Sequence, residues 1–211
     1  ELFEKLAGEG KQILALLVSS KLSGTISSAV QAKELLPKAE IEIVDSYSTA
    51  MALGFQVLAA ARAVESGRTF AEVADVARRA SAHTGIVIAV DTLEFLQKGG
   101  RIGGAAALIG SVLQVKPILE LRDGQVEPLE RERTQRKALA RLKELVLAQA
   151  ARGADSRLSV LHAGAPDAAK SLAADLGRQL DVTDVMIMDL TPAIVTHAGP
   201  GMLGVGFFVA G

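Results

Sequence analysis

Val18-Ser19-Ser20-Lys21-Leu22-Ser23-Gly24-Thr25 is the stretch that decides the fold, because it separates two different apolar patterns. The uninterrupted apolar run before it, residues 13–18, is typical of a fully buried strand. The apolar residues after it recur at helical spacing, namely Ile26, Ala29, Val30, Leu35 and Leu36. We therefore predict that residues 18–25 form a turn from a buried strand into a helix.

A strand-to-helix turn at the carboxyl edge of a parallel sheet favours an anion, because backbone N–H groups and the helix dipole point to it. A single hydroxyl would be enough to cap the helix, so simple capping by Ser23 or Thr25 is the alternative. The stretch contains four hydroxyl side chains, which exceeds that need. We predict an oxyanion or carboxylate site with these candidates: Ser19, Ser20, Ser23, Gly24 and Thr25.

The composition excludes several classes of protein. Hydrophobic residues make up 49% of the chain and aromatic residues only 3%, so a surface that stacks nucleic-acid bases is not expected. The 23 Lys and Arg against 24 Asp and Glu give a net charge of -1, which also argues against a nucleic-acid partner. There is no cysteine, and the three histidines stand far apart, so we expect neither disulfides nor a metal site.

The apolar runs and the first residues of the sequence indicate where in the cell the protein is found. No apolar run is long enough to span a bilayer, and residues 1–6 are charged rather than typical of a signal peptide. We expect a soluble, cytoplasmic protein. The chain starts without methionine, in what reads as a helix directly before a buried strand, so we also expect that an N-terminal segment precedes it.

The first part of the chain follows a βαβ pattern. A strand at 41–44 closes the unit and places Asp45 and Ser46 at its carboxyl end, close to the serine-rich turn. Two helices that cover the sheet are expected next, at 51–64 and 70–80. The second helix begins with a capping-box pattern, in which Glu72 follows Thr69 by three residues.

An antiparallel hairpin indicates a second subdomain. Apolar runs at 117–121 and 125–129 flank Arg122-Asp123-Gly124, and Asp-Gly is a strong hairpin signal. This element departs from the repeating βα pattern. We therefore predict two α/β subdomains, at 1–83 with a parallel βαβ core and at 84–211 with a mixed sheet.

The other elements of the second subdomain are expected as strands at 85–90, 158–162, 185–189 and 205–209, and as helices at 105–113, 134–151 and 168–180. Asp91 and Glu94 have capping-box spacing, and we expect them to begin a short helix that ends at Gly99 and Gly100.

Two motifs suggest enzymes. Gly199 to Gly204 matches the Gly-x-Gly-x-x-Gly pattern, but only seven residues follow, too few for a dinucleotide-binding unit. A Ser-His-Asp hydrolase could be assembled from Ser20 or Ser23 with His197 and Asp45, because such triads are defined by geometry rather than chain order. The hydrolase stays open as an alternative.

Arg101 stands among four glycines, in Gly99-Gly100-Arg101-Ile102-Gly103-Gly104. Glycines on both sides indicate close backbone packing, where a guanidinium pairs well with an acid group. A solvated surface arginine is the alternative interpretation.

Five motifs occur in one order over nearly the whole chain: Ser19-Ser20-Lys21-Leu22-Ser23-Gly24-Thr25; Val44-Asp45-Ser46; Asp91 to Ile102; Lys116-Pro117-Ile118-Leu119 with Asp123-Gly124; and His197-Ala198-Gly199-Pro200-Gly201. Together they resemble the DegV family of bacterial fatty-acid-binding proteins.

The resemblance implies a two-domain α/β protein of the DegV type that holds one long-chain fatty acid between its domains. It also implies the binding subunit of a bacterial fatty acid kinase, which presents the carboxylate to a separate ATP-dependent kinase protein. That partner would form an acyl phosphate for phospholipid synthesis. The chain itself is then expected to be a carrier and not an enzyme, with no cofactor besides the bound fatty acid.

The resemblance also assigns residues. It places the carboxylate at the serine-rich turn, with Ser20 as the first candidate, and puts Arg101, His197 and Gly199 near the ligand or the partner. The family begins with a segment that carries a Thr-Ser-x-Pro-Ser type motif, which this sequence lacks. Part of the ligand cradle is therefore expected to be missing.

A fatty acid of about sixteen carbons would gain on the order of 12 kcal/mol from burial of its methylenes, before the costs of association. The apolar segment at 105–113 could line such a channel or could be an ordinary core helix. The alternative function is a small-molecule enzyme, a hydrolase or transferase, that acts on a carboxylated or phosphorylated metabolite at the same serine-rich site. A structural or regulatory interaction protein is a third possibility.

Overall fold

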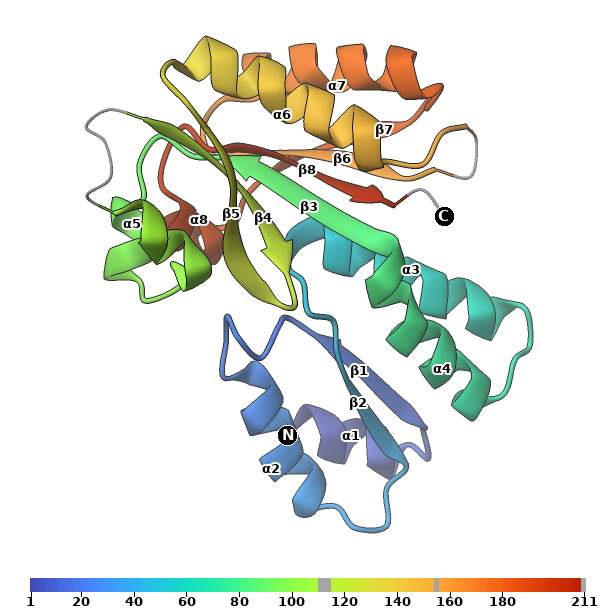
Figure 1. The fold of residues 1–211 in the computed structure, drawn as a ribbon. Coiled ribbons are helices and arrows are strands. Elements are labelled where there is room, and N and C mark those ends of the chain that lie inside the picture. Colours follow the sequence, from blue (N-terminus) through green and yellow to red (C-terminus); the bar gives the residue numbers. More distant parts are fainter. Residues whose placement is uncertain (110–114, 154–155, 210–211) are drawn as a thin grey trace.

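The structure, a computed structural model, describes residues 1–109, 115–153 and 156–209. It contains a two-stranded sheet in its smaller part and a six-stranded sheet in its larger part (Figure 1). The helices are α1 Leu2–Gly8, α2 Thr25–Glu34, α3 Ala50–Glu65, α4 Phe70–Ala80, α5 Glu94–Lys98, α6 Gln135–Gln149, α7 Pro166–Leu180 and α8 Pro192–Ala198. The strands are β1 Ile13–Leu17, β2 Ile41–Asp45, β3 Thr84–Ala89, β4 Lys116–Arg122, β5 Gln125–Glu132, β6 Leu158–His162, β7 Val185–Asp189 and β8 Leu203–Phe208. The predicted α/β class is confirmed.

The smaller part is a parallel βαβ unit, as predicted. Strands β1 and β2 pair in parallel, so that Leu17 lies opposite Asp45, and α2 connects them. The backbone N–H of Ser20 donates to Asp45 Oδ2 over 3.2 Å. The predicted proximity of Asp45 to the serine-rich turn is therefore confirmed.

The larger sheet has the strand order β5-β4-β3-β8-β6-β7. Only β6 and β7 pair in parallel, and the other neighbours are antiparallel, so the sheet is mixed as predicted. Helices α6 and α7 cover one face, while α3, α5 and α8 lie on the other side (Figure 1). In the hairpin of β4 and β5, Asp123 and Gly124 have φ of 51° and 82°, which is typical of a type I′ turn.

Successive residues of β3 face opposite sides of this sheet. Val87 and Ala89 belong to the core beneath α6 and α7. Ile86 belongs to a second cluster on the other side, and Ile88 packs against that cluster. The sheet therefore supplies apolar side chains to both faces.

Two local predictions were wrong at least in part, and one short helix was not predicted. Asp91 does not cap α5: the hydroxyl of Thr92 accepts from Glu94 N, and Asp91 pairs with Lys116. The expected helix at 105–113 is a 3₁₀ helix at Gly103–Leu108, and the predicted positions 110–113 lie outside the described residues. Helix α8 was missed because its seven residues are too few to show a periodic pattern.

The capping box at the start of α4 is confirmed in full, with Thr69 and Glu72 exchanging hydrogen bonds. The proposed division of the chain at residue 83 stays a prediction. All six strands of the larger sheet follow that residue, but α3, which precedes it, packs against β3 and β8.

Candidate functional site

A cavity of about 450 Å³ lies between the serine-rich turn, the hairpin of β4 and β5, and α8. Most of its wall is apolar, including Ile86 and Ile88 of β3 and Leu161 of β6. Five polar residues complete the wall: Ser23, Thr25, Thr49, Arg101 and His197. A largely apolar cavity of this volume with a few polar groups is typical of a small-molecule site.

The hydroxyl groups of the serine-rich turn point in different directions. Ser19 is fully buried, and its hydroxyl donates to the carbonyl of Gly124 over 2.6 Å. Ser20 is exposed and does not line the cavity. Ser23 and Thr25 do line it, and their hydroxyls lie 2.8 Å apart.

The hydroxyl side chains that the turn contributes to the cavity wall therefore come from its second half. The structure does not bring Ser20, the first candidate for the carboxylate, to the cavity wall, and Ser19 and Gly24 also lie outside the wall. The reason is geometric: Ser19 lies two residues after β1 with its hydroxyl bound to the hairpin, and Ser20 follows with its amide bound to Asp45.

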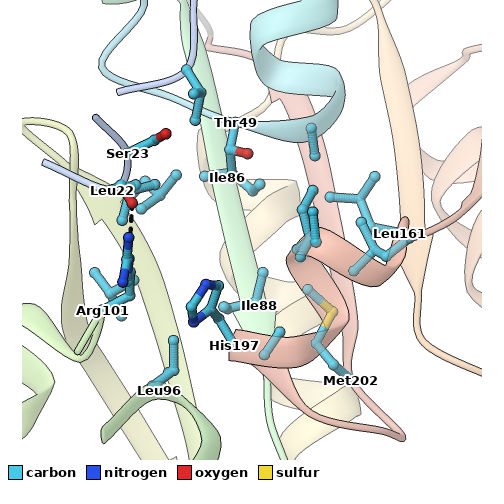
Figure 2. Close-up of a pocket in the computed structure, with 18 of the residues that line it drawn as sticks. Leu22, Ser23, Thr49, Ile86, Ile88, Leu96, Arg101, Leu161, His197 and Met202 are labelled. Carbon is cyan, nitrogen blue, oxygen red and sulfur yellow. Dashed lines mark hydrogen bonds between the residues drawn. The ribbon is translucent and has the colours of Figure 1, made fainter. Parts of the chain in front are cut away.

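Arg101 is held beside this turn by its own hydrogen bonds. Its Nε donates to the carbonyl of Leu22 over 2.9 Å, and its Nη1 donates to the carbonyl of Gly99 over 2.7 Å. Figure 2 shows Arg101 directly below Leu22 and Ser23, on the side of the cavity opposite Leu161. A cationic guanidinium is thus fixed against the backbone of the turn, at the residue before Ser23.

His197 reaches the cavity from α8 and lies between Arg101 and Ile88 in Figure 2. Its Nδ1 is buried against Gly99, where an added methyl group would collide with that nitrogen. Nδ1 has no hydrogen-bond partner among the residues that the structure describes. A ligand in the cavity would therefore meet Nε2, the other nitrogen of the ring.

Gly199, the last predicted site residue, does not line the cavity. Its φ is 82°, and a Cβ at this position would lie 2.5 Å from Cδ2 of Phe95. Gly199 thus allows α8 to end close against α5 and acts on the site only through the position of α8.

Sequence reasoning missed most of the apolar wall. Leu190 follows the end of β7 and Met202 precedes β8, and the polar Thr49, which lies before α3, was also missed. Strand periodicity marks Ile86 and Ile88 as inward-facing residues. The periodicity does not show that a cavity lies next to these two side chains.

The Ser-His-Asp arrangement is not assembled. The carboxylate of Asp45 accepts hydrogen bonds from the amides of Ser20 and Tyr47, and Asp45 does not line the cavity. No carboxylate contacts His197 within the described part of the chain. The hydrolase interpretation therefore lacks its acid.

Within residues 1–109, 115–153 and 156–209, no group of three His, Cys, Asp or Glu is arranged to hold a metal ion. None of the helices in these ranges has the length and apolar character that a membrane crossing requires.

The resolved shifts in pKa lie outside the cavity wall. Glu130 on β5 accepts two hydrogen bonds of 2.7 Å from Arg141 on α6. These bonds lower the pKa of Glu130 and raise that of Arg141. The pair joins the hairpin to the helical layer on the far side of the sheet.

The comparisons with known proteins agree with this architecture. A DegV domain-containing protein of Streptomyces coelicolor is 44% identical over 207 residues, which cover 97% of this chain and 73% of that protein. A structure described as the fatty acid binding of a DegV family protein from Thermus thermophilus has a TM-score of 0.89 and 31% identity, and covers 99% of this chain and 75% of that one.

Bacillus subtilis DegV, described as a fatty acid binding protein, has a TM-score of 0.87 and 30% identity, and the match covers 99% of this chain and 74% of that one. The family model described as "Uncharacterised protein, DegV family" matches residues 1–210. The chain therefore belongs to the DegV family.

Proposed function

We propose that this chain binds a long-chain fatty acid in the cavity and presents its carboxylate to a separate ATP-dependent kinase protein, which forms an acyl phosphate for phospholipid synthesis. The observation that carries the proposal is the composition of the wall: an apolar cavity with Ser23, Arg101 and His197 in it. The relatives from Thermus thermophilus and Bacillus subtilis are described as fatty acid binding, which supports the choice of ligand.

The apolar wall supplies the affinity. Each methylene removed from water contributes about 0.8 kcal/mol, so the acyl chain outweighs the head group in the binding free energy. Ile86, Ile88 and Leu161 offer the surface on which the chain would lie. Because the wall is aliphatic rather than aromatic, we propose that it selects by length and shape.

The polar residues offset the cost of burying the carboxylate. An unpartnered carboxylate inside a protein costs several kcal/mol. Ser23 and Arg101 lie on the same side of the cavity, and His197 also lines it. These donors support a carboxylate at this side, with the acyl chain directed towards Leu161.

The hydrogen bonds of Arg101 and Ser23 support a carrier role. Arg101 is bound to two backbone carbonyls, and the hydroxyl of Ser23 is bound to that of Thr25, so among the described residues neither is paired with a base. The proposed phosphorylation would use the nucleotide and metal of the partner. Because ATP is cytoplasmic, we propose that the carrier acts in the cytoplasm.

The test is the content of the cavity after purification from cells. Native mass spectrometry should find one acyl chain per protein, and the protein stripped of lipid should take up palmitate or oleate. If the purified protein carries no acyl chain and the stripped protein binds none, the small-molecule enzyme becomes the better interpretation.

The head-group assignment is tested by comparing two serines of the turn. Ser23→Ala should weaken palmitate binding by at least about tenfold, since loss of a hydrogen bond to a charged group costs roughly 1.5 to 3 kcal/mol. Hydroxylamine trapping of acyl phosphate, with the kinase and ATP added, should fall in parallel.

Ser20→Ala should have the smaller effect, because Ser20 lies outside the cavity wall. The matched control is Ser27→Ala, an exposed serine on α2. If Ser20→Ala is the more damaging variant, the carboxylate lies at the first half of the turn and the assignment to Ser23 is wrong.

A further inference from the structure

The hairpin of β4 and β5 reaches from the larger sheet to the serine-rich turn, and its tip is bound there by Ser19. We propose that Ser19 is a positioning residue, whose hydroxyl holds the hairpin tip against the turn and thereby keeps the two walls of the cavity together. The proposal rests on the proposed function, since it concerns how the bound acid is retained.

The contact at the tip is close and specific. Ser19 Oγ donates to the carbonyl of Gly124 over 2.6 Å and accepts from the amide of Lys21 over 3.2 Å. A Cβ on Gly124 would lie 2.5 Å from Ser19 Oγ and 3.0 Å from Cδ1 of Tyr47. The tip therefore sits between the segments that follow β1 and β2, and only glycine leaves room for it.

Both sides of this contact continue into the cavity wall. Leu121 and Val126 lie on the hairpin near its tip, and both line the cavity. On the other side, the carbonyl of Ser19 accepts from the amides of Leu22 and Ser23, at 3.0 Å each. The Ser19 to Gly124 bond thus connects two wall segments that are about a hundred residues apart in sequence.

A second hydrogen bond joins the same turn to the larger part of the molecule. Arg101 Nε donates to the carbonyl of Leu22, as Figure 2 shows. The turn that carries Ser23 is therefore held at Ser19 from one side and at Leu22 from the other. Loss of the first bond would remove the hydrogen bond at the hairpin tip and keep the one at Leu22, which would let the hairpin move away from the turn.

The experiment compares Ser19→Ala with wild type in two measurements on the full chain. The first is the dissociation rate of a fluorescent fatty acid, such as an anthroyloxy-labelled palmitate, followed by competition with unlabelled palmitate. We expect about a tenfold faster dissociation, equivalent to about 1.4 kcal/mol, because the carbonyl of Gly124 would be left without its donor. The second is the NMR carbonyl resonance of Gly124, which should shift when its donor is removed.

Ser27→Ala, from exposed helix α2, is the matched control and should change neither measurement. If Ser19→Ala does not fold, Tyr47→Ala serves instead, because Tyr47 is 50% exposed and supports the other side of the tip. It should also speed dissociation.

An unchanged Gly124 resonance in Ser19→Ala would overturn the contact itself. A shifted resonance with an unchanged dissociation rate would overturn the role in retention, while the proposed function would stand. A wild-type protein that binds no fatty acid would overturn both.

Discussion

The two faces of the six-stranded sheet receive similar apolar side chains, yet one face is packed and the other borders a cavity. On the first face, Val87 lies under the fifteen-residue helices α6 and α7. On the second face, Ile86 and Ile88 line the cavity. The helix beside this cavity, α8, has only seven residues. The sixteen-residue α3 also packs against this second face, at β3 and β8, so the cavity lies where the short helices α5 and α8 cover the sheet and does not come from a shortage of apolar residues in the strands.

The largest effect is expected on the packed face. Leu142→Ala removes a fully buried side chain from α6 and should lower the free energy of unfolding by about 2 to 5 kcal/mol, because the core there cannot collapse into the space. Urea unfolding measures this. Ile88→Ala on the cavity side should cost clearly less, since that side chain already borders empty space. Equal losses would contradict the difference between the faces.

Filling the cavity should separate binding from stability. Ile88→Trp adds a large side chain on the cavity wall and should weaken palmitate binding by at least about tenfold, while the added apolar contacts keep the urea midpoint close to that of wild type. Val57→Trp is the control, because Val57 is 43% exposed on the outer side of α3. Unchanged binding in Ile88→Trp would mean that the acid lies elsewhere.

A moderate effect is expected at the contact between α5 and α8. Gly99→Ala places a methyl group where His197 Nδ1 now lies, so the imidazole must move. We expect palmitate affinity to fall several-fold, measured by isothermal titration, since a misplaced hydrogen-bond donor costs about 1 kcal/mol. Gly8→Ala, at a position with no atom within 4 Å of the new Cβ, should leave affinity unchanged.

The smallest effect is expected from the ion pair behind the packed face. The hydrogen bonds from Arg141 hold the pKa of Glu130 below its ordinary value of 4.5. A carboxylate whose pKa is lowered by folding stabilises the folded state above its ordinary pKa, and this contribution is lost as the pH falls through the lowered value.

Glu130→Gln should therefore lower the melting temperature slightly at pH 7, and the difference from wild type should shrink below about pH 4.5. Melting curves at pH 7 and pH 3.5 measure it. A difference that grows in acid would show that the pair does not stabilise the fold in this way.

Much of the fold could be predicted because its signals are local. The Asp123-Gly124 turn and the Thr69 capping box depend on a few adjacent residues, and both were found as predicted. Helix α8 and the 3₁₀ segment could not be predicted in the same way. They are shorter than the window over which periodicity is readable, and the surrounding structure determines their form.

The candidate site was predicted only in part, because a turn can be recognised from sequence while the direction of its side chains cannot. Ser23, Thr25, Arg101 and His197 come together at the cavity, although they span most of the chain. The family resemblance gives Ser20 as the first candidate, but the sequence does not show which hydroxyl of the turn points to the cavity. The hairpin that binds Ser19 comes about a hundred residues later in the chain, and it removes that hydroxyl from the candidates for the cavity.

The cavity wall runs from Val18 to Met202, so it exists only when the whole chain is folded. Any ligand in it binds the native state and not the unfolded chain. By mass action, a ligand at a hundred times its dissociation constant adds about 2.7 kcal/mol to the apparent free energy of unfolding. The thermal stability of this protein should therefore follow the supply of its ligand, and lipid carried through purification would make one preparation melt higher than another.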